Sequence, residues 1–161
     1  MWGGTDRRQA VHAIRAAIDE GVTAIDTAPI YGQGLSEEIV GEAISEVPRD
    51  RVQVLTKFGF RWDVKQGELA MNTQDHAGRP LKVYKYAGKE SVIFECEQSL
   101  RRLRTDHIDL LQHHSPDPTT PISETMEALE LLVRQGKVRY VGVSNYTAEQ
   151  VDEAREHTLV V

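Results

Sequence analysis

Side chains that can bind or transfer protons recur at the ends of four predicted strands. In chain order these residues are Asp26 and Tyr31, Lys57, His113 and His114, and finally Ser144 and Asn145. In parallel α/β proteins, reactive groups gather at the C-terminal ends of the strands and in the loops that follow them. The sequence therefore predicts that these residues meet at one edge of a sheet.

A phenol, an amine, a carboxylate and an imidazole at one site form a proton-transfer system. The pKa of a free tyrosine is about 10, too high for an efficient acid at neutral pH, and a neighbouring ammonium group lowers it. Lys57 could supply that charge, and Asp26 could keep Lys57 protonated and oriented. A histidine could hydrogen-bond the substrate oxygen or help to relay a proton. This chemistry makes Tyr31 a candidate general acid.

Alternation along the third strand separates the two histidines. Side chains of a strand point to opposite faces in turn, so His114 shares a face with Gln112 while His113 points the other way. Only one histidine is expected to reach the centre of the site, and Gln112 is a candidate ligand contact beside it. A metal-dependent hydrolase built on Asp26 and both histidines is disfavoured by this geometry. The chain also lacks the His-x-His and His-Glu-x-x-His spacings of zinc sites.

Each of these residues also has a structural explanation when it is taken alone. A tyrosine in a glycine-containing loop commonly packs on the surface, a lysine at a strand end is commonly solvated, and an aspartate before a threonine often forms a turn. Joint placement at three successive strand ends favours a functional site. Trp2 and Trp62 could line a substrate pocket or serve only in packing.

Alternating helix and strand patterns position these side chains and predict parallel strands joined by crossover helices. The expected strands cover residues 22–26, 52–57, 107–114 and 138–144, and residues 159–161 look like the start of another. The expected helices start at Thr5, Ser36, Ser91, Pro121 or Ser123, and Thr147, where Gln150 completes a capping box. Residues 58–88 are polar without a clear period, and 60–88 is expected to be a long loop insertion. That loop either faces the substrate or is a mobile surface segment.

The number of units leaves two architectures open. Four strand and helix pairs follow a leading helix, whereas a closed eight-stranded barrel typically needs about 250 residues. The strands therefore form either an open doubly wound sheet or part of a barrel.

Composition limits the classes of partner and compartment. The formal charge of −6 is spread along the chain without a basic run, so neither nucleic acid nor an anionic membrane is an expected partner. The chain has no apolar run near the roughly 18 residues of a membrane span. The single cysteine, Cys96, excludes an intrachain disulfide and lies in a helical apolar pattern, where burial is expected. These features predict a soluble protein of the reducing cytoplasm.

Four long segments of the chain resemble the aldo-keto reductases, in particular the branch of bacterial stress-protein reductases and potassium-channel β subunits. The segments are GVTAIDTAPIYGQGLSEEIVGEAI, VLTKFG, SLRRLRTDHIDLLQHHSPD and LLVRQGKVRYVGVSNY. Their length, order and spacing make the resemblance specific, and it covers nearly the whole chain apart from residues 60–88. The implied fold is an α/β (β/α)8 barrel of which about half, roughly four to five βα units, is present.

The resemblance also implies an activity and the residues that perform it. The activity is reduction of aldehydes or ketones by hydride transfer from NADPH, with no metal in the site. The implied catalytic set is Tyr31 as the acid, Lys57, Asp26 as the orienting carboxylate and His114 on the substrate side. In the family, the serine and asparagine that match Ser144 and Asn145 bind the nicotinamide carboxamide, and the position of Asp26 lies near the nicotinamide ribose. The implied small molecules are therefore a carbonyl substrate and NADP(H).

The family's opening hairpin, first strand and last strands have no counterpart among the 161 residues. In the family the last strands supply the aromatic that stacks on the nicotinamide and the loops that hold the pyrophosphate and 2′-phosphate. We interpret the chain as a fragment that, in isolation, binds cofactor weakly or not at all and whose exposed sheet edges favour self-association. Two alternatives stay open: an inactive truncated fragment, and a redox-sensing regulatory subunit like the channel β proteins. The substrate is not indicated by the residues, and the preference for NADPH over NADH rests on the family alone.

Overall fold

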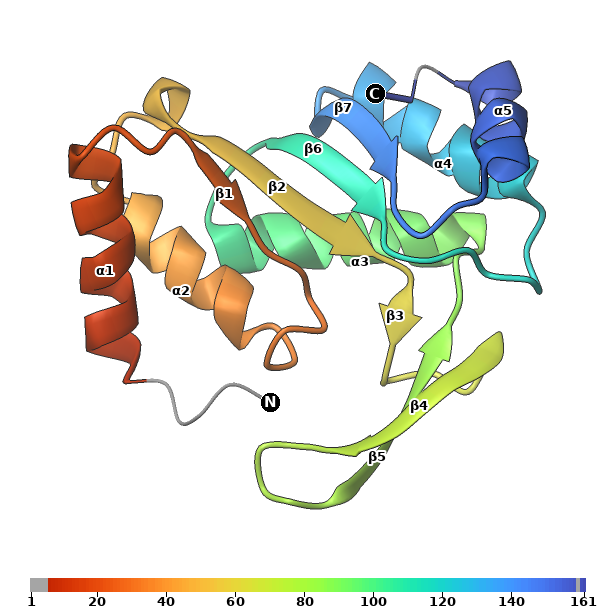
Figure 1. Ribbon diagram of the computed structural model, residues 1–161, viewed down its shortest axis with the longest axis horizontal. Helices are drawn as coiled ribbons and strands as arrows, with labels where there is room; N and C mark the ends of the chain where they lie inside the picture. The colour runs from red at the N-terminus through yellow and green to blue at the C-terminus, as the bar shows by residue number, and fades with distance from the viewer. Residues whose placement is uncertain (1–5, 159) are drawn as a thin grey trace.

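The computed structural model describes residues 6–158 and 160–161, and helices and strands alternate along them as the sequence predicts (Figure 1). Trp2 and Thr5 lie outside the described residues. The strands are β1 (Ala24–Asp26), β2 (Gln53–Phe58), β3 (Phe60–Arg61), β4 (Glu68–Gln74), β5 (Pro80–Lys85), β6 (Ile108–His113) and β7 (Val138–Val143). The helices are α1 (Arg7–Asp19), α2 (Leu35–Ile44), α3 (Lys89–Leu103), α4 (Ile122–Arg134) and α5 (Ala148–His157), with a 3₁₀ turn at Arg49–Arg51.

Four parallel strands form the main sheet, in the order β1-β2-β6-β7. The order in space follows the order in sequence, and in Figure 1 α2, α3 and α4 lie on the same side of the sheet. A doubly wound sheet reverses its strand order and has helices on both faces. The arrangement is therefore that of a singly wound barrel segment, and the doubly wound alternative is wrong.

The hydrophobic core lies between this sheet and its helices. Buried side chains from β2 and β6, such as Val54 and Leu111, pack against Val92 and Cys96 of α3. The expected burial of Cys96 is confirmed. On the opposite face of the sheet, in the described part of the chain, the side chain of Tyr140 is 60% exposed. The apolar helices thus stabilise one face and leave the other open.

Two of the predicted helix starts differ from the observed ones. Asp6 caps α1, since its carboxylate accepts hydrogen bonds from the amides of Arg8 and Gln9. The helix therefore starts one residue later than a cap at Thr5 predicts. Gly34, with φ of +98°, precedes α2, while the hydroxyl of Ser36 lies 2.8 Å from that of Thr27. A left-handed glycine can end a loop without a side-chain cap, which sequence patterns for N-caps do not detect.

A third start also differs, because Lys89 begins α3 two residues before Ser91. The last two agree, and Pro121 precedes α4 as predicted. At α5, the Thr147 hydroxyl accepts from the Gln150 amide and the Gln150 side chain accepts from the Thr147 amide, so the predicted capping box is confirmed. Val160 pairs with Val141 of β7 in a parallel bridge, which agrees with the predicted start of a strand, although residue 159 lies outside the described residues.

The segment expected to be a loop insertion contains regular structure. β3, β4 and β5 form a separate antiparallel sheet in the order β3-β5-β4, which extends away from the main sheet, below it in Figure 1. The expectation of a loop without strands over residues 60–88 is wrong. A register shift between Leu69 and Met71 interrupts the alternation of β4, which explains why no period of two is visible. Asp75 organises the tip by accepting hydrogen bonds from the amides of Ala77 and Arg79.

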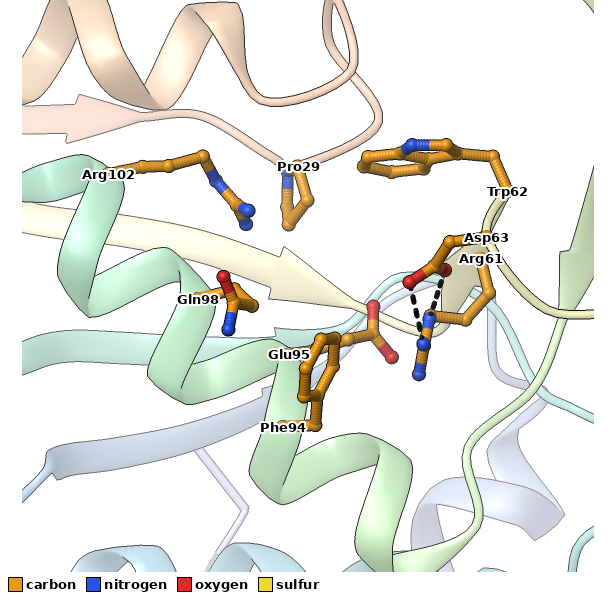
Figure 2. Close-up of a pocket in the computed structure, with 8 residues that line it drawn as sticks. All are labelled: Pro29, Arg61, Trp62, Asp63, Phe94, Glu95, Gln98 and Arg102. Carbon is orange, nitrogen blue, oxygen red and sulfur yellow. Dashed lines mark hydrogen bonds and ion pairs between the residues drawn. The ribbon is translucent and has the colours of Figure 1, made fainter.

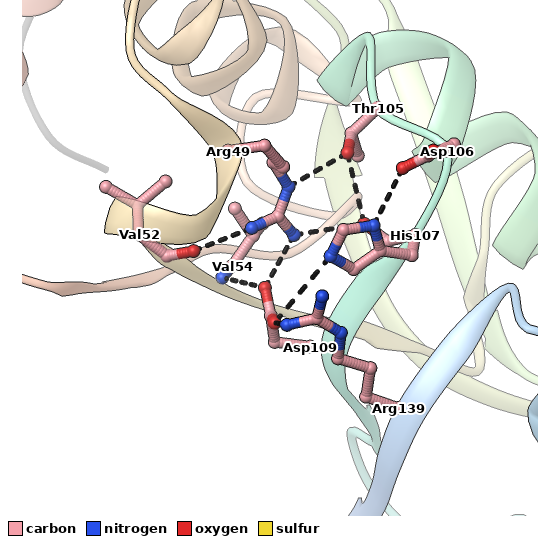
Figure 3. Close-up of polar contacts among 8 residues, drawn as sticks. All are labelled: Arg49, Val52, Val54, Thr105, Asp106, His107, Asp109 and Arg139. Atoms are coloured by element: carbon pink, nitrogen blue, oxygen red, sulfur yellow. Dashed lines mark hydrogen bonds and ion pairs between the residues drawn. The ribbon is translucent and has the colours of Figure 1, made fainter.

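A network of charged side chains ties the strands together at their N-terminal ends, opposite the candidate site (Figure 3). Asp109 at the start of β6 accepts from the Val54 amide at 2.8 Å and pairs with Arg49 and Arg139. These contacts, chiefly the hydrogen bonds and the two guanidinium charges, hold the pKa of Asp109 below its usual value despite its burial. The N-terminal face of a barrel contributes stability more than chemistry, and this network fits that division.

Candidate active site

The ion pair between Lys57 and Asp26 joins the C-terminal ends of β1 and β2. Both Asp26 carboxylate oxygens accept from Lys57 Nζ, at 2.8 and 2.7 Å, and the Thr27 carbonyl accepts at 3.0 Å. The Lys57 side chain is 9% exposed, whereas that of Asp26 is 54% exposed. Three oxygen acceptors around a buried ammonium group fix its position, so the amine is an oriented cation at the end of the sheet.

Tyr31 lies on the loop that connects β1 with α2, above this ion pair. Lys57 Nζ lies 5.3 Å from the centre of the Tyr31 ring, and Tyr31 as a whole is 43% exposed. Gly32, Gln33 and Gly34 all have left-handed backbone conformations, which turns the loop sharply after Tyr31. Non-glycine residues rarely adopt this conformation, so Gln33 marks a constrained loop. The phenol therefore projects from a fixed turn beside the ammonium group.

The two histidines at the end of β6 occupy opposite faces, as alternation predicts. The His114 ring meets Tyr31 edge to face at 5.9 Å between centres and Phe60 at 4.8 Å. His113 is buried, stacks on Phe58 and lies 2.7 Å, Nδ1 to oxygen, from the Tyr146 hydroxyl. Burial, reinforced by the nearby Lys57 charge, lowers the pKa of His114 to about 4. His114 is therefore a neutral imidazole beside the phenol at pH 7.

Three further predicted residues lie next to His114. Gln112 pairs in register with Lys57 of β2 on one side and Gly142 of β7 on the other, so it lies on the strand in the middle of the site. The Asn145 side-chain amide donates to the His114 carbonyl at 2.8 Å and to the Ser144 hydroxyl at 3.1 Å. The structure thus brings all the predicted catalytic and cofactor-binding residues to the C-terminal edge of one sheet.

Behind this edge lies a cavity of about 130 Å³ between β3 and α3 (Figure 2). Its lining includes Trp62, as well as Arg61, which pairs with Asp63 at 2.7 Å. Glu95 points into the same space, and its carboxylate accepts from the Gly59 amide at 3.0 Å. Burial raises the pKa of Glu95 from 4.5 to about 7.

Glu95 and Tyr146 were not predicted from the sequence, because each contacts a residue that is distant in the chain: Gly59 for Glu95 and His113 for Tyr146. No local spacing marks a glutamate in the middle of a helix as buried, or a tyrosine after a strand as the partner of a histidine 33 residues earlier. Within residues 6–158 and 160–161, no cluster of three histidine, cysteine or acidic side chains is arranged to hold a metal ion. None of the helices in that part of the chain is long and apolar enough to span a membrane.

Comparison with known proteins assigns this arrangement to a family. The model of the aldo/keto reductase family matches residues 1–160. The chain belongs to the aldo/keto reductase family. The predicted resemblance is therefore confirmed.

Curated aldo-keto reductases share substantial identity with the chain. Aldo-keto reductase YhdN of Bacillus subtilis is 46% identical over 156 residues, covering 96% of this chain and 42% of the relative. The NADH-specific methylglyoxal reductase of Escherichia coli is 38% identical over 156 residues, covering 94% and 46%. The chain thus spans less than half the length of the curated relatives it matches.

Solved aldo-keto reductase structures agree in fold. The glycerol dehydrogenase AKR11B4 from Gluconobacter oxydans superposes with a TM-score of 0.85 at 43% identity, covering 99% of this chain and 45% of that one. An aldo-keto reductase from Klebsiella pneumoniae in complex with NADPH gives a TM-score of 0.74 at 37% identity, covering 94% and 44%. The fold is that of a (β/α)8 barrel with about half of the barrel present, as predicted.

Proposed function

We propose that this chain carries the catalytic half of an NADPH-dependent reductase that converts aldehydes or ketones to alcohols. The observation that supports it most strongly is the group formed by Tyr31, Lys57, Asp26 and His114. A phenol, a buried ammonium held by a carboxylate, and a neutral imidazole surround one point at the strand ends. Reduction of a carbonyl needs a proton donor for the developing alkoxide, and this group provides one.

In this mechanism Tyr31 donates its phenolic proton to the carbonyl oxygen as the alkoxide forms. Lys57, fixed by Asp26 and the Thr27 carbonyl, places a positive charge beside the phenol and favours the phenolate left behind. The pKa of His114 is about 4, so its imidazole is neutral at pH 7. It can therefore hydrogen-bond the substrate oxygen without adding a second positive charge beside Lys57. Each residue thus has one task at one edge of the sheet.

The nicotinamide cofactor supplies the hydride when it is bound. The residues present suit its carboxamide end, because Ser144 and Asn145 offer a hydroxyl and an amide, which can both donate and accept hydrogen bonds. We propose that these two residues hold the carboxamide, that Asp26 lies near the ribose, and that Gln112 contributes from β6. A solved relative named as an NADPH complex supports NADP(H), although another relative is named as NADH-specific.

We further propose a cytoplasmic location and small carbonyl compounds as substrates. The chain's single cysteine, Cys96, is buried in α3, so this half of the protein needs no oxidising compartment. The four-residue group at the strand ends recognises a carbonyl oxygen through polar contacts alone.

The test uses a full barrel in which residues 1–161 replace the matching part of the Bacillus subtilis relative, with that relative as the control. We expect the barrel to bind NADPH in a fluorescence titration and to reduce a small aldehyde. Tyr31→Phe should lower turnover by roughly 10²- to 10⁴-fold with NADPH affinity unchanged, since it removes only the acid. A barrel that binds NADPH but turns over equally well with Tyr31→Phe would refute this mechanism.

A further inference from the structure

We propose that the buried His113 and the half-buried Tyr146, behind the sheet, act as a positioning pair that fixes Ser144 and Asn145 for cofactor binding. The inference rests on the proposed function. Neither member touches the open face of the sheet where Lys57 and His114 meet. The pair instead joins the end of β6 to the loop after β7, in which Ser144, Asn145 and Tyr146 are consecutive.

The His113 end of the pair is held rigidly. The ring is 1% exposed and stacks on Phe58, with 4.8 Å between ring centres and 10° between planes. Gly59 lies against its edge, and a Cβ at that position would come within 2.8 Å of the ring. The imidazole therefore has no room to rotate away from the Tyr146 hydroxyl, which lies 2.7 Å from Nδ1.

Both members of the pair are neutral at pH 7. Burial lowers the pKa of His113 to about 4 and raises the pKa of the Tyr146 phenol above its ordinary value. The contact is thus one hydrogen bond between uncharged groups, which does not change over the working range of pH. In the part of the chain that the structure describes, His113 Nε2 has no hydrogen-bond partner, so Tyr146 is the single polar contact of the imidazole.

The loop end of the pair turns sharply and is fastened at several points. Asn145 has φ of +60°, a left-handed conformation that asparagine adopts more readily than most non-glycine residues. The Ser144 amide donates to the His113 carbonyl at 2.9 Å, and the Asn145 side chain donates to the His114 carbonyl. With Tyr146 bound to the His113 side chain, three consecutive residues are fastened to the end of β6. The hydroxyl of Ser144 and the amide of Asn145 are thereby held in fixed directions.

The main experiment compares Tyr146→Phe with Tyr84→Phe in the full barrel described above. Each removes one phenolic oxygen, and Tyr84 lies on the separate hairpin sheet. We expect Tyr146→Phe to weaken NADPH binding by about 3- to 10-fold, the loss expected for one neutral hydrogen bond, with kcat at saturating NADPH and the aldehyde KM changed by less than about twofold. Tyr84→Phe should change none of these values.

A double-mutant cycle tests whether the two residues act together. His113→Phe can still stack on Phe58 but cannot bond Tyr146, so the double variant should bind NADPH as weakly as either single variant. Additive losses, or a lowered thermal stability with unchanged NADPH affinity, would show a merely structural role and overturn the proposal.

A spectroscopic readout on the full barrel without cofactor is independent of catalysis. Tyr146→Phe should speed hydrogen exchange of the Asn145 side-chain amide, which donates to His114, whereas unchanged exchange would overturn the proposal. A failure of the proposed function would give a different result. The barrel without the Tyr146 substitution would then not bind NADPH, or its turnover would not depend on Tyr31.

Discussion

Replacing the buried Glu95 with glutamine should make the protein more stable at high pH and leave it unchanged at low pH. The carboxyl accepts from the Gly59 amide at 3.0 Å and from the Ser91 hydroxyl at 3.2 Å, while Arg61 lies nearby. Burial outweighs these contacts and raises the Glu95 pKa to about 7. Glutamine keeps an oxygen for the Gly59 amide and can donate to the Ser91 hydroxyl oxygen, so the geometry is preserved.

The size and sign of the effect follow from linkage. The folded pKa of about 7 lies above the ordinary value of 4.5, so folding costs nothing extra below pH 4.5, where both states are protonated. The cost grows as pH rises to 7 and then stays constant. The difference between the folded pKa of about 7 and the ordinary pKa of 4.5 corresponds to about 3 kcal/mol, because one pKa unit is worth about 1.36 kcal/mol.

Urea unfolding of both proteins, followed by tryptophan fluorescence between pH 4 and pH 8.5, measures this difference directly. The advantage of Glu95→Gln in free energy of unfolding should rise from near zero at pH 4 to about 3 kcal/mol at pH 8. Other titrating groups cancel because they are common to both proteins. A difference that is the same at every pH, or one that favours Glu95 at pH 8, would refute the claim that burial dominates at this carboxyl.

Three further predictions concern the frame around the site. Asp109→Asn should lower the free energy of unfolding by about 2 kcal/mol, because it removes the carboxylate charge that pairs with Arg49 and Arg139, while kcat stays unchanged; urea unfolding and steady-state kinetics check both. Gly59→Ala should lower the melting temperature by several degrees, since Gly59 has φ of +98° and its new Cβ would meet the His113 ring; an unchanged melting temperature contradicts the packing described. The 161-residue chain alone should associate with increasing concentration through its exposed sheet edges, and light scattering that reports a monomer at all concentrations would contradict this.

The position of the proposed catalytic group could be predicted from the sequence because strand rules are local. Asp26 and Lys57 end strands with clear patterns, and alternation alone separates His114 from His113. Parallel pairing then brings the strand ends to one edge, without any knowledge of side-chain contacts. These features depend on the alternation of side chains along each strand and on the order of the strands in the chain, both of which can be read from the amino-acid sequence.

The remaining features depend on contacts between distant segments. The burial of Glu95 is set by the packing of α3 against the end of β2, and the partner of Tyr146 lies on another strand. The strands of residues 60–88 were not predicted, because the irregular register between Leu69 and Met71 hides their alternation. These features can be inferred only when the three-dimensional fold is known.

The separation of the two sheets sets where the chain can tolerate insertions and deletions. One added residue in β2 would turn Lys57 to the opposite face, because side chains alternate along a strand. One added residue in β4 would leave the main sheet in register, because β4 pairs only with β5, and would shift the contacts that Gln74 and His76 make with Gln33 and Gly32. Changes in length between Arg61 and Lys85 therefore leave the register of the main sheet unchanged, and with it the face to which Lys57 points.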